Sequence, residues 1–251
     1  MGAANGRRSE AGARLFAAMS VVTSEPSGGP PEPTHTPPNV RLVAVAVALA
    51  IVVLGVLAFF TMRSESGETD DNDGWAGTLL GAPLAKPEFT LTDTSGNPYD
   101  FGQQTDGYVT LLYFGYTHCP DVCPLHMANV ASVIQEVSGE VNAKIKVVFV
   151  TTDPARDTAP VIRKWLDNFD VTFVGLTGTP AEIAAAEQAA RLPEAVLEPP
   201  SADGSYKVGH ASQVIAYSLD DEAHLVYPFG IRQADWARDL PRLVATTEWP
   251  A

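Results

Sequence analysis

The chain has 251 residues, of which 16 are Lys or Arg and 30 are Asp or Glu, and its formal net charge is −14. Residues 64–251 carry 11 basic and 27 acidic side chains, a net charge of −16. Nucleic-acid binding needs a basic face, so this balance argues against a nucleic-acid partner. It is compatible with a soluble outer domain and with attraction to cations or basic partners.

The N-terminal part divides into a tail and an apolar segment. Residues 1–41 are rich in Pro, Gly and Ser and cannot bury a core, which predicts a disordered tail. Residues 42–62 are apolar or small and carry no charge. A helix of this length spans about 30 Å, the thickness of a bilayer's hydrocarbon core. The segment is longer than the apolar core of a signal peptide, so we expect an uncleaved transmembrane helix.

Arginine placement suggests an orientation for this helix in the cell membrane. Arg41 and Arg63 flank it on either side, but Arg7, Arg8 and Arg14 add positive charge to the tail. The positive-inside rule therefore places the N-terminus in the cytoplasm. The C-terminal domain would face outward as a single-pass protein, where a dithiol can be oxidised.

The outer part begins with an acidic linker over residues 63–81. Residues 82–251 are long enough for one domain with a real core. Residues 87–93, followed by a turn at 95–98, predict a short hairpin. Residues 108–115 and 144–151 are nearly continuous apolar runs, typical of strands buried on both faces.

The remaining elements alternate along the chain. Apolar residues recur at helical spacing from 125 to 141, with Pro124 expected at the first helical position. The later elements are a helix over 157–169 capped by Asp157 or Thr158, a strand at 171–175, a helix over 179–191, an irregular loop at 193–206, a hairpin of 214–217 and 224–227, and a helix over 233–247. This order predicts an α/β, thioredoxin-like fold: a central mixed sheet with helices on both faces.

Cys119 and Cys123 are the only cysteines, and they lie in YFGYTHCPDVCP at 113–124. A disulfide between them would close a tiny loop and stabilise little, so the pair indicates redox or metal chemistry. At a helix entry their Cα atoms lie about 6 Å apart, close enough for a disulfide. Both sulfurs could also bind one soft ion, Cu(I) or Zn(II). We expect Cys123, at the helix start, to be stabilised as a thiolate.

Two sulfurs leave such an ion under-coordinated, so a third ligand is expected among the five histidines. His210, between a long loop and a strand and preceded by the flexible Gly209, is the best placed. The others are His35 in the tail, His118 pointing away from Cys119, His126 one helical turn beyond Cys123 and still a candidate, and His224 as an ordinary strand residue.

Three charged residues near the motif have simple structural interpretations. Asp121 lies between the cysteines and could offer a weak oxygen ligand to Cu(II), although a solvated loop acid is the simpler interpretation. Asp153 and Arg156 follow the second buried strand. For these two we favour helix capping and a local ion pair over a direct role.

The segments GYTHCPDVCP (115–124) and TDPARDT (152–158), together with His210, resemble the Sco/SenC family over about residues 82–247. The resemblance implies that Cys119, Cys123 and His210 bind one copper ion per chain and that the dithiol is redox-active. It also implies a membrane-anchored, outward-facing protein that assists assembly of the binuclear copper centre of cytochrome c oxidase. Its partners would be the copper-bearing oxidase subunit and a thiol reductant or another copper chaperone.

One departure concerns the neighbours of His210. Many members of the family have an acidic residue before the histidine and a hydroxyl after it, whereas this chain has Gly209 and Ala211. Because a metal-binding histidine usually has a hydrogen-bond partner on its other nitrogen, we expect a different partner here.

Several functions remain open at this point. A copper metallochaperone and a thiol–disulfide oxidoreductase share the same residues, so enzymatic activity is undecided. CxxxC spacing counts against a general thioredoxin. A peroxidase would need one activated thiolate in a substrate pocket, and a zinc site would want a fourth strong ligand.

Overall fold

The structure, a computed structural model, describes residues 43–45, 49–55 and 72–249. The chain divides into two compact units, Met1–Ser66 and Gly67–Ala251. Of the predicted transmembrane segment, residues 43–45 and 49–55 are helical. The rest of that segment and the predicted tail lie outside the described residues. Within the described ranges, no helix combines the length and apolar character needed to cross a membrane.

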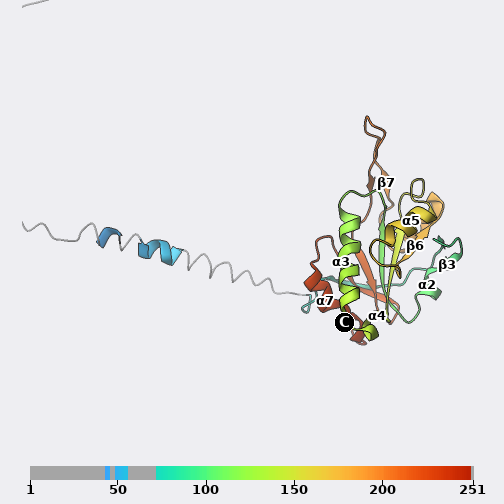
Figure 1. Cartoon of the computed structure of the whole chain (residues 1–251). Helices are drawn as coiled ribbons and strands as arrows, with labels where there is room; N and C mark the ends of the chain where they lie inside the picture. The colour runs from blue at the N-terminus through green and yellow to red at the C-terminus, as the bar shows by residue number, and fades with distance from the viewer. Residues whose placement is uncertain (1–42, 46–48, 56–71, 250–251) are drawn as a thin grey trace, which may run out of the picture. The chain divides into compact units, whose positions relative to one another are not determined.

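The second unit is built on an eight-stranded mixed sheet (Figure 1). The pairs β4–β5 and β5–β6 are parallel, and the other neighbours are antiparallel. In order across the sheet the strands are β1 (Thr78–Ala85), β10 (Glu222–Tyr227), β9 (Val214–Tyr217), β4 (Val109–Gly115), β5 (Ile145–Thr151), β6 (Val174–Thr177), β2 (Thr90–Asp93) and β3 (Pro98–Asp100). A separate pair, β7 (Val196–Leu197) and β8 (Val208–Gly209), stands at the end of the domain away from the C-terminus (Figure 1).

Helices cover both faces of the sheet, as predicted. The helices of the described domain are α2 (Phe101–Gln104), α3 (Val122–Glu136), α4 (Gly139–Asn142), α5 (Ala159–Leu166), α6 (Pro180–Ala189) and α7 (Gln233–Ala245). Buried side chains of α3, α5 and α7 share one hydrophobic cluster with the sheet, and those of α6 and α2 share the other. The prediction of a two-sided α/β fold is confirmed.

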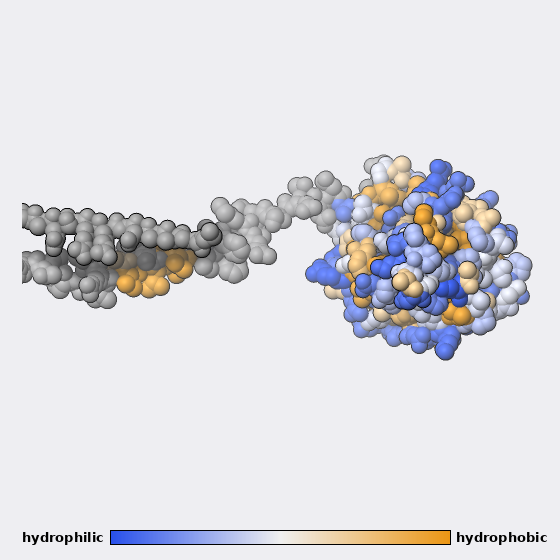
Figure 2. Space-filling model, turned by 90° about the horizontal axis from the view of Figure 1, so that it is seen from above, coloured by the Kyte–Doolittle hydropathy of each residue, from blue (hydrophilic) through white to orange (hydrophobic). Residues whose placement is uncertain are grey.

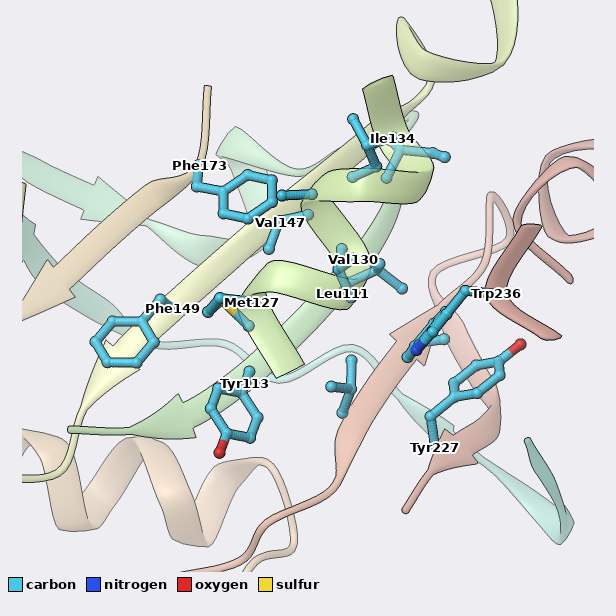
Figure 3. Packing of buried hydrophobic residues seen from close by; sticks show 14 of the residues in the cluster. Leu111, Tyr113, Met127, Val130, Ile134, Val147, Phe149, Phe173, Tyr227 and Trp236 are labelled. Carbon is cyan, nitrogen blue, oxygen red and sulfur yellow. The ribbon is translucent and has the colours of Figure 1, made fainter. Parts of the chain in front are cut away.

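The near-continuous apolar sequence of β4 follows from this layering. All seven of its residues are buried, because successive side chains point alternately into the two clusters. On the face of the domain seen in Figure 2, hydrophilic and hydrophobic residues are mixed. Figure 3 shows the buried α3 side, where Met127, Val130 and Ile134 pack against a sheet face that includes Leu111.

The parallel pairing of β4 and β5 decides where the two motifs meet. Gly115 ends β4 and pairs with Thr151, which ends β5. The segments that follow therefore leave the sheet at the same edge. One contains the two cysteines, and the other is residues 152–158. Sequence-distant motifs are thus brought side by side by strand register.

Some boundaries differ from the sequence-based expectations. The first strand, β1, begins at Thr78, inside the segment expected to be a linker. The helix after the cysteines begins at Val122 and not after Pro124, so this proline is the third helical residue. It is still in the first turn, where a missing N–H leaves no helical bond unmade. Thr158, not Asp157, precedes α5 as its N-cap residue.

Three further differences are local. The helix expected to reach residue 141 ends at Glu136, and Ser138 caps the separate α4. The strand expected at 171–175 begins at Val174. The loop expected over 193–206 contains β7, which pairs with β8. The hairpins β2–β3 and β9–β10 and the helix α6, with its Thr179 capping box, agree with expectation.

Candidate metal and redox site

Asp157 ties the two motifs together at the sheet edge. Its buried carboxylate accepts hydrogen bonds from the Thr117 backbone N–H (2.8 Å), the Thr117 hydroxyl (2.6 Å) and the Thr151 hydroxyl (2.7 Å). Beside it, the Thr152 N–H donates to the Gly115 carbonyl at 2.7 Å. The entry to the cysteine motif is therefore held against the end of β5.

The two cysteines lie in different environments. Cys119 is partly exposed, in a turn closed by its N–H donating to the Tyr116 carbonyl at 3.2 Å. Cys123 is fully buried in the first turn of α3. Its backbone N–H points at Cys119 Sγ, 3.4 Å away. Both cysteines are free thiols in this structure.

This geometry assigns the charge to Cys119. A hydrogen bond from the Cys123 thiol, with further help from backbone N–H groups of Asp121, Val122 and Cys123, lowers the pKa of Cys119 to about 5, although partial burial opposes the shift. The hydrogen bond that the Cys123 thiol donates to Cys119, together with burial, raises the pKa of Cys123. The expectation that Cys123 carries the thiolate is wrong. The N–H groups at the start of α3 face the sulfur of Cys119, which lies in the turn before the helix.

His210 approaches the buried sulfur from the loop after β8. Its Nε2 lies 3.7 Å from Cys123 Sγ, although the two residues are 87 positions apart. Its Nδ1 lies 2.8 Å from the Ala211 carbonyl oxygen, which can only accept a hydrogen bond. The neutral ring is therefore protonated at Nδ1 and has a lone pair on Nε2, facing the sulfur. The Ala211 backbone carbonyl is therefore the hydrogen-bond partner of His210 Nδ1, a role that the side chains at positions 209 and 211 cannot fill.

The sulfurs of Cys119 and Cys123 and the Nε2 atom of His210 are not all within binding distance of a single ion in this structure. Among the described residues, one group of three possible metal-ligand atoms has all its members within 4.8 Å of one another. That group is Asp220, Glu222 and His224, and it includes neither cysteine. Since Cys123 Sγ and His210 Nε2 are 3.7 Å apart, Cys119 Sγ must lie more than 4.8 Å from at least one of them. Binding of one ion by all three would draw Cys119 and His210 toward each other. Two sulfurs and a free imidazole nitrogen otherwise suit a soft ion such as Cu(I).

Tyr113 lies beside Cys123 and His210. Its hydroxyl donates to Cys123 Sγ at 3.3 Å. Its ring centroid is 6.1 Å from that of His210 and 5.1 Å from that of His126. Burial, and then the neighbouring Cys123, raise the pKa of Tyr113, so the phenol stays protonated.

Three of the other histidines lie in the described residues, and none of these three makes a hydrogen bond to a cysteine sulfur. His126 is 3 % exposed, and burial lowers its pKa. Its Nε2 has no hydrogen-bond partner, and its ring faces Tyr113 and Phe229. His118 turns its Nδ1 toward Thr117 and Asp157. His224 bonds Asp220 and stacks on Trp249. His35 lies outside the described residues.

The acidic residues behave mostly as expected. Asp121 precedes α3, and its side chain makes no capping hydrogen bond. The expected ion pair between Asp153 and Arg156 is confirmed. The pair also contacts Tyr206, which was not expected. The Tyr206 hydroxyl donates to Asp153 at 3.0 Å, and Arg156 Cζ lies 3.6 Å from the centroid of the Tyr206 ring. The pair therefore anchors the loop that leads to His210.

Sequence reasoning missed two residues that shape the site. Tyr113 looked like an ordinary core aromatic of a buried strand, and Asp157 looked like a helix cap. The only available signal was position: Tyr113 lies two residues before the end of β4, and Asp157 lies in the loop between β5 and α5. Neither contact follows from spacing, because each joins segments that only the fold brings together.

The fold and the site together define a thioredoxin-like α/β domain that presents a CxxxC dithiol and a distant histidine at one sheet edge. The chain belongs to the SCO1/SenC family, whose model matches residues 78–245. It is 34% identical over 185 residues to SenC of Rhodobacter capsulatus, covering 70% of this chain and 76% of that protein.

Two further comparisons agree. The mitochondrial protein SCO2 of Saccharomyces cerevisiae is 29% identical over 188 residues, 73% of this chain and 60% of that protein, so the match spans less than two thirds of the yeast protein. A solved structure of Bradyrhizobium japonicum ScoI with copper bound is 32% identical, with a TM-score of 0.57, covering 64% of this chain and 99% of that chain.

Proposed function

We propose that this protein is a copper metallochaperone that binds Cu(I) or Cu(II) through Cys119, Cys123 and His210. The observation that carries the proposal is the 3.7 Å separation between Cys123 Sγ and His210 Nε2. A free imidazole lone pair opposite the buried Cys123 sulfur, beside the Cys119 thiolate, is a soft-metal donor set. The similarity to ScoI, whose solved structure has copper bound, supports the same cargo.

Copper is the cargo, and each residue has a distinct task in holding it. Cys119 is ionised at neutral pH because its pKa is about 5, and it is partly exposed, so it meets the incoming ion. Cys123 loses its proton to solvent when it binds. His210 completes a trigonal site with two sulfurs and one nitrogen for Cu(I), one ion per chain. Cu(II) would add a weak fourth ligand, for which Asp121 is a candidate. Delivery proceeds by exchange with a partner's thiols.

The biological role we propose is assembly of the binuclear copper centre of cytochrome c oxidase. The family resemblance supports this role. The client would be the copper-bearing oxidase subunit, and a further partner would be a thiol reductant that supplies electrons or another chaperone that supplies copper. The apolar, uncharged segment 42–62 supports a single-pass anchor. The N-terminus would be cytoplasmic and the site would face outward.

A second candidate is a thiol–disulfide oxidoreductase that reduces the client's copper-ligand cysteines. The asymmetry of the pair favours it. The Cys119 thiolate would attack a client disulfide, forming a mixed disulfide and releasing one client thiolate. Cys123, after losing its proton, would attack the Cys119 sulfur and release the second. The client gains two electrons, and a separate reductant must restore both thiols.

Copper affinity of the full chain in detergent tests the first candidate. We expect His210→Ala to weaken Cu(I) binding by about 100-fold or more, because it removes a ligand and not only a ligand's partner. His224→Ala, a histidine variant in the neighbouring strand β10, should bind like the wild type. Equal affinity of His210→Ala and the wild type would remove His210 from the site. A reductase would keep its disulfide exchange in His210→Ala and lose it in Cys119→Ser.

A further inference from the structure

Within the described part of the chain, the hydroxyl of Tyr113 makes one hydrogen bond, to the sulfur of Cys123, at 3.3 Å. Both side chains are fully buried, with Tyr113 and Cys123 each 0% exposed. A phenol O–H is a hydrogen-bond donor, and its hydrogen bond to sulfur is stronger when the sulfur carries negative charge or binds a metal. Because water is excluded there, loss of this donor would not be replaced by solvent.

The surrounding packing holds the phenol against the sulfur. A Cβ atom at Gly115 would lie 2.7 Å from Tyr113 Cε1 and 3.0 Å from Cys123 Sγ. The ring and the sulfur therefore occupy the space above a residue that has no side chain. Phe149 closes the same space, 3.2 Å from that Cβ position. With its edge enclosed in this way, the ring has little freedom to turn its hydroxyl elsewhere.

We propose that Tyr113 is a positioning residue that tunes the copper–thiolate bond of Cys123 through this hydrogen bond. The inference rests on the proposed copper site and adds a residue to it. A hydrogen bond to a thiolate sulfur withdraws electron density from the metal–sulfur bond, and hydrogen bonding around such a sulfur sets the redox potential of copper sites. It favours Cu(I) over Cu(II), because Cu(II) depends more on electron donation from sulfur.

The same bond acts without metal. The reduced Cys123 sulfur accepts a hydrogen bond from the phenol, whereas a sulfur in a Cys119–Cys123 disulfide is a poorer acceptor. Tyr113 therefore stabilises the dithiol relative to the disulfide. Its loss should shift the exchange equilibrium with glutathione toward the disulfide.

Tyr113→Phe tests the inference, because it keeps the ring and removes only the hydroxyl. In the full chain we expect the sulfur-to-Cu(II) absorption band to move to longer wavelength. The ratio of Cu(I) to Cu(II) affinity should fall roughly three- to tenfold, and the metal-free exchange constant with glutathione should shift toward the disulfide by a similar factor. Tyr217→Phe, another fully buried tyrosine of the sheet, is the matched control and should leave all three unchanged.

A second substitution covers the case in which Tyr113→Phe does not fold. Replacement of Tyr113 by 3-fluorotyrosine keeps the shape and makes the hydroxyl a stronger donor, so each shift should reverse in sign. Unchanged spectra and exchange constants in a folded variant at position 113, or equal shifts in Tyr217→Phe, would overturn the inference. If the wild-type chain bound no copper, the proposed function would fail, and the glutathione equilibrium alone would still decide the role of Tyr113.

Discussion

At the scale of single residues, the site depends on a division of work between two cysteines only four positions apart. Cys119 accepts hydrogen bonds from helix N–H groups and from the Cys123 thiol, while Cys123 is enclosed by Tyr113 and the core. The pair was evident from sequence, and so was the metal or redox chemistry of two thiols. Which sulfur is charged was not, because it depends on how the loop turns before α3 begins.

The charge on Cys119 predicts a pH profile for its alkylation. The thiolate is the nucleophile, and the pKa of Cys119 is about 5. Iodoacetamide should therefore modify Cys119 at a constant rate above about pH 6, and the rate should fall as the pH drops through 5. Cys119→Ser should react slowly, because the remaining thiol of Cys123 is buried and protonated. A rate in the wild type that rises only above pH 8 would contradict the assignment.

Gly115→Ala tests how tightly the sulfur is enclosed. The new methyl group would meet Tyr113, Cys123 and Phe149 at 2.7–3.2 Å, and overpacking of this kind costs about 1–3 kcal/mol. We expect that loss in the free energy of unfolding, measured by denaturant titration. At Gly139, an added Cβ has no heavy atom within 4 Å, so Gly139→Ala should be neutral or slightly stabilising. Equal stability of the two variants would show that the space above Gly115 is adjustable.

At the scale of elements, the parallel strands β4 and β5 bring the cysteine motif and residues 152–158 to one edge of the sheet. Long apolar strands, the α6 capping box and the two hairpins were predictable, because each carries its signal in adjacent residues. β1 was not, since it is an edge strand with a mostly exposed, irregular burial pattern and a register shift. β7 and β8 are two residues each, too short for any periodicity to reveal.

Asp157 is the link between elements whose removal should matter most. Asp157→Ala would leave the Thr117 N–H and the Thr151 hydroxyl without their buried acceptor, at a cost of about 2–4 kcal/mol. Asp167→Ala is a suitable control, because Asp167 makes an exposed i,i+4 pair with Arg163 and should contribute less than about 1 kcal/mol. Denaturant unfolding of both variants measures the difference. If the two losses were equal, Asp157 would not be the anchor of the motif.

At the scale of the whole molecule, an acidic domain follows an apolar segment. The thioredoxin-like domain was predictable from the order of its elements, and His210 was the best-placed third ligand from its position before a strand. Its actual distance from Cys123 was not predictable, because a loop of this length does not determine where its end lies. The resemblance to the Sco/SenC family strengthened the choice of His210 before the fold was in view.

The proposed anchor predicts the behaviour of the full chain in cells. The intact protein should sediment with membranes and resist extraction at high pH, because about 20 apolar residues span a bilayer. Deletion of residues 42–62 should release it into the soluble fraction. Deletion of residues 20–40, which has the same length, should leave it with the membranes. Membrane association that survived loss of 42–62 would require another means of attachment.

The central claim is that two sulfurs and one distant imidazole hold a single metal ion. Copper K-edge X-ray absorption of the Cu(I)-loaded full chain tests it most directly, with wild-type protein and His210→Ala compared. The account predicts a three-coordinate ion with two sulfur neighbours and one imidazole, and loss of the imidazole signal in the variant. A two-coordinate ion bound by sulfur alone in the wild type, with a spectrum unchanged in His210→Ala, would contradict it.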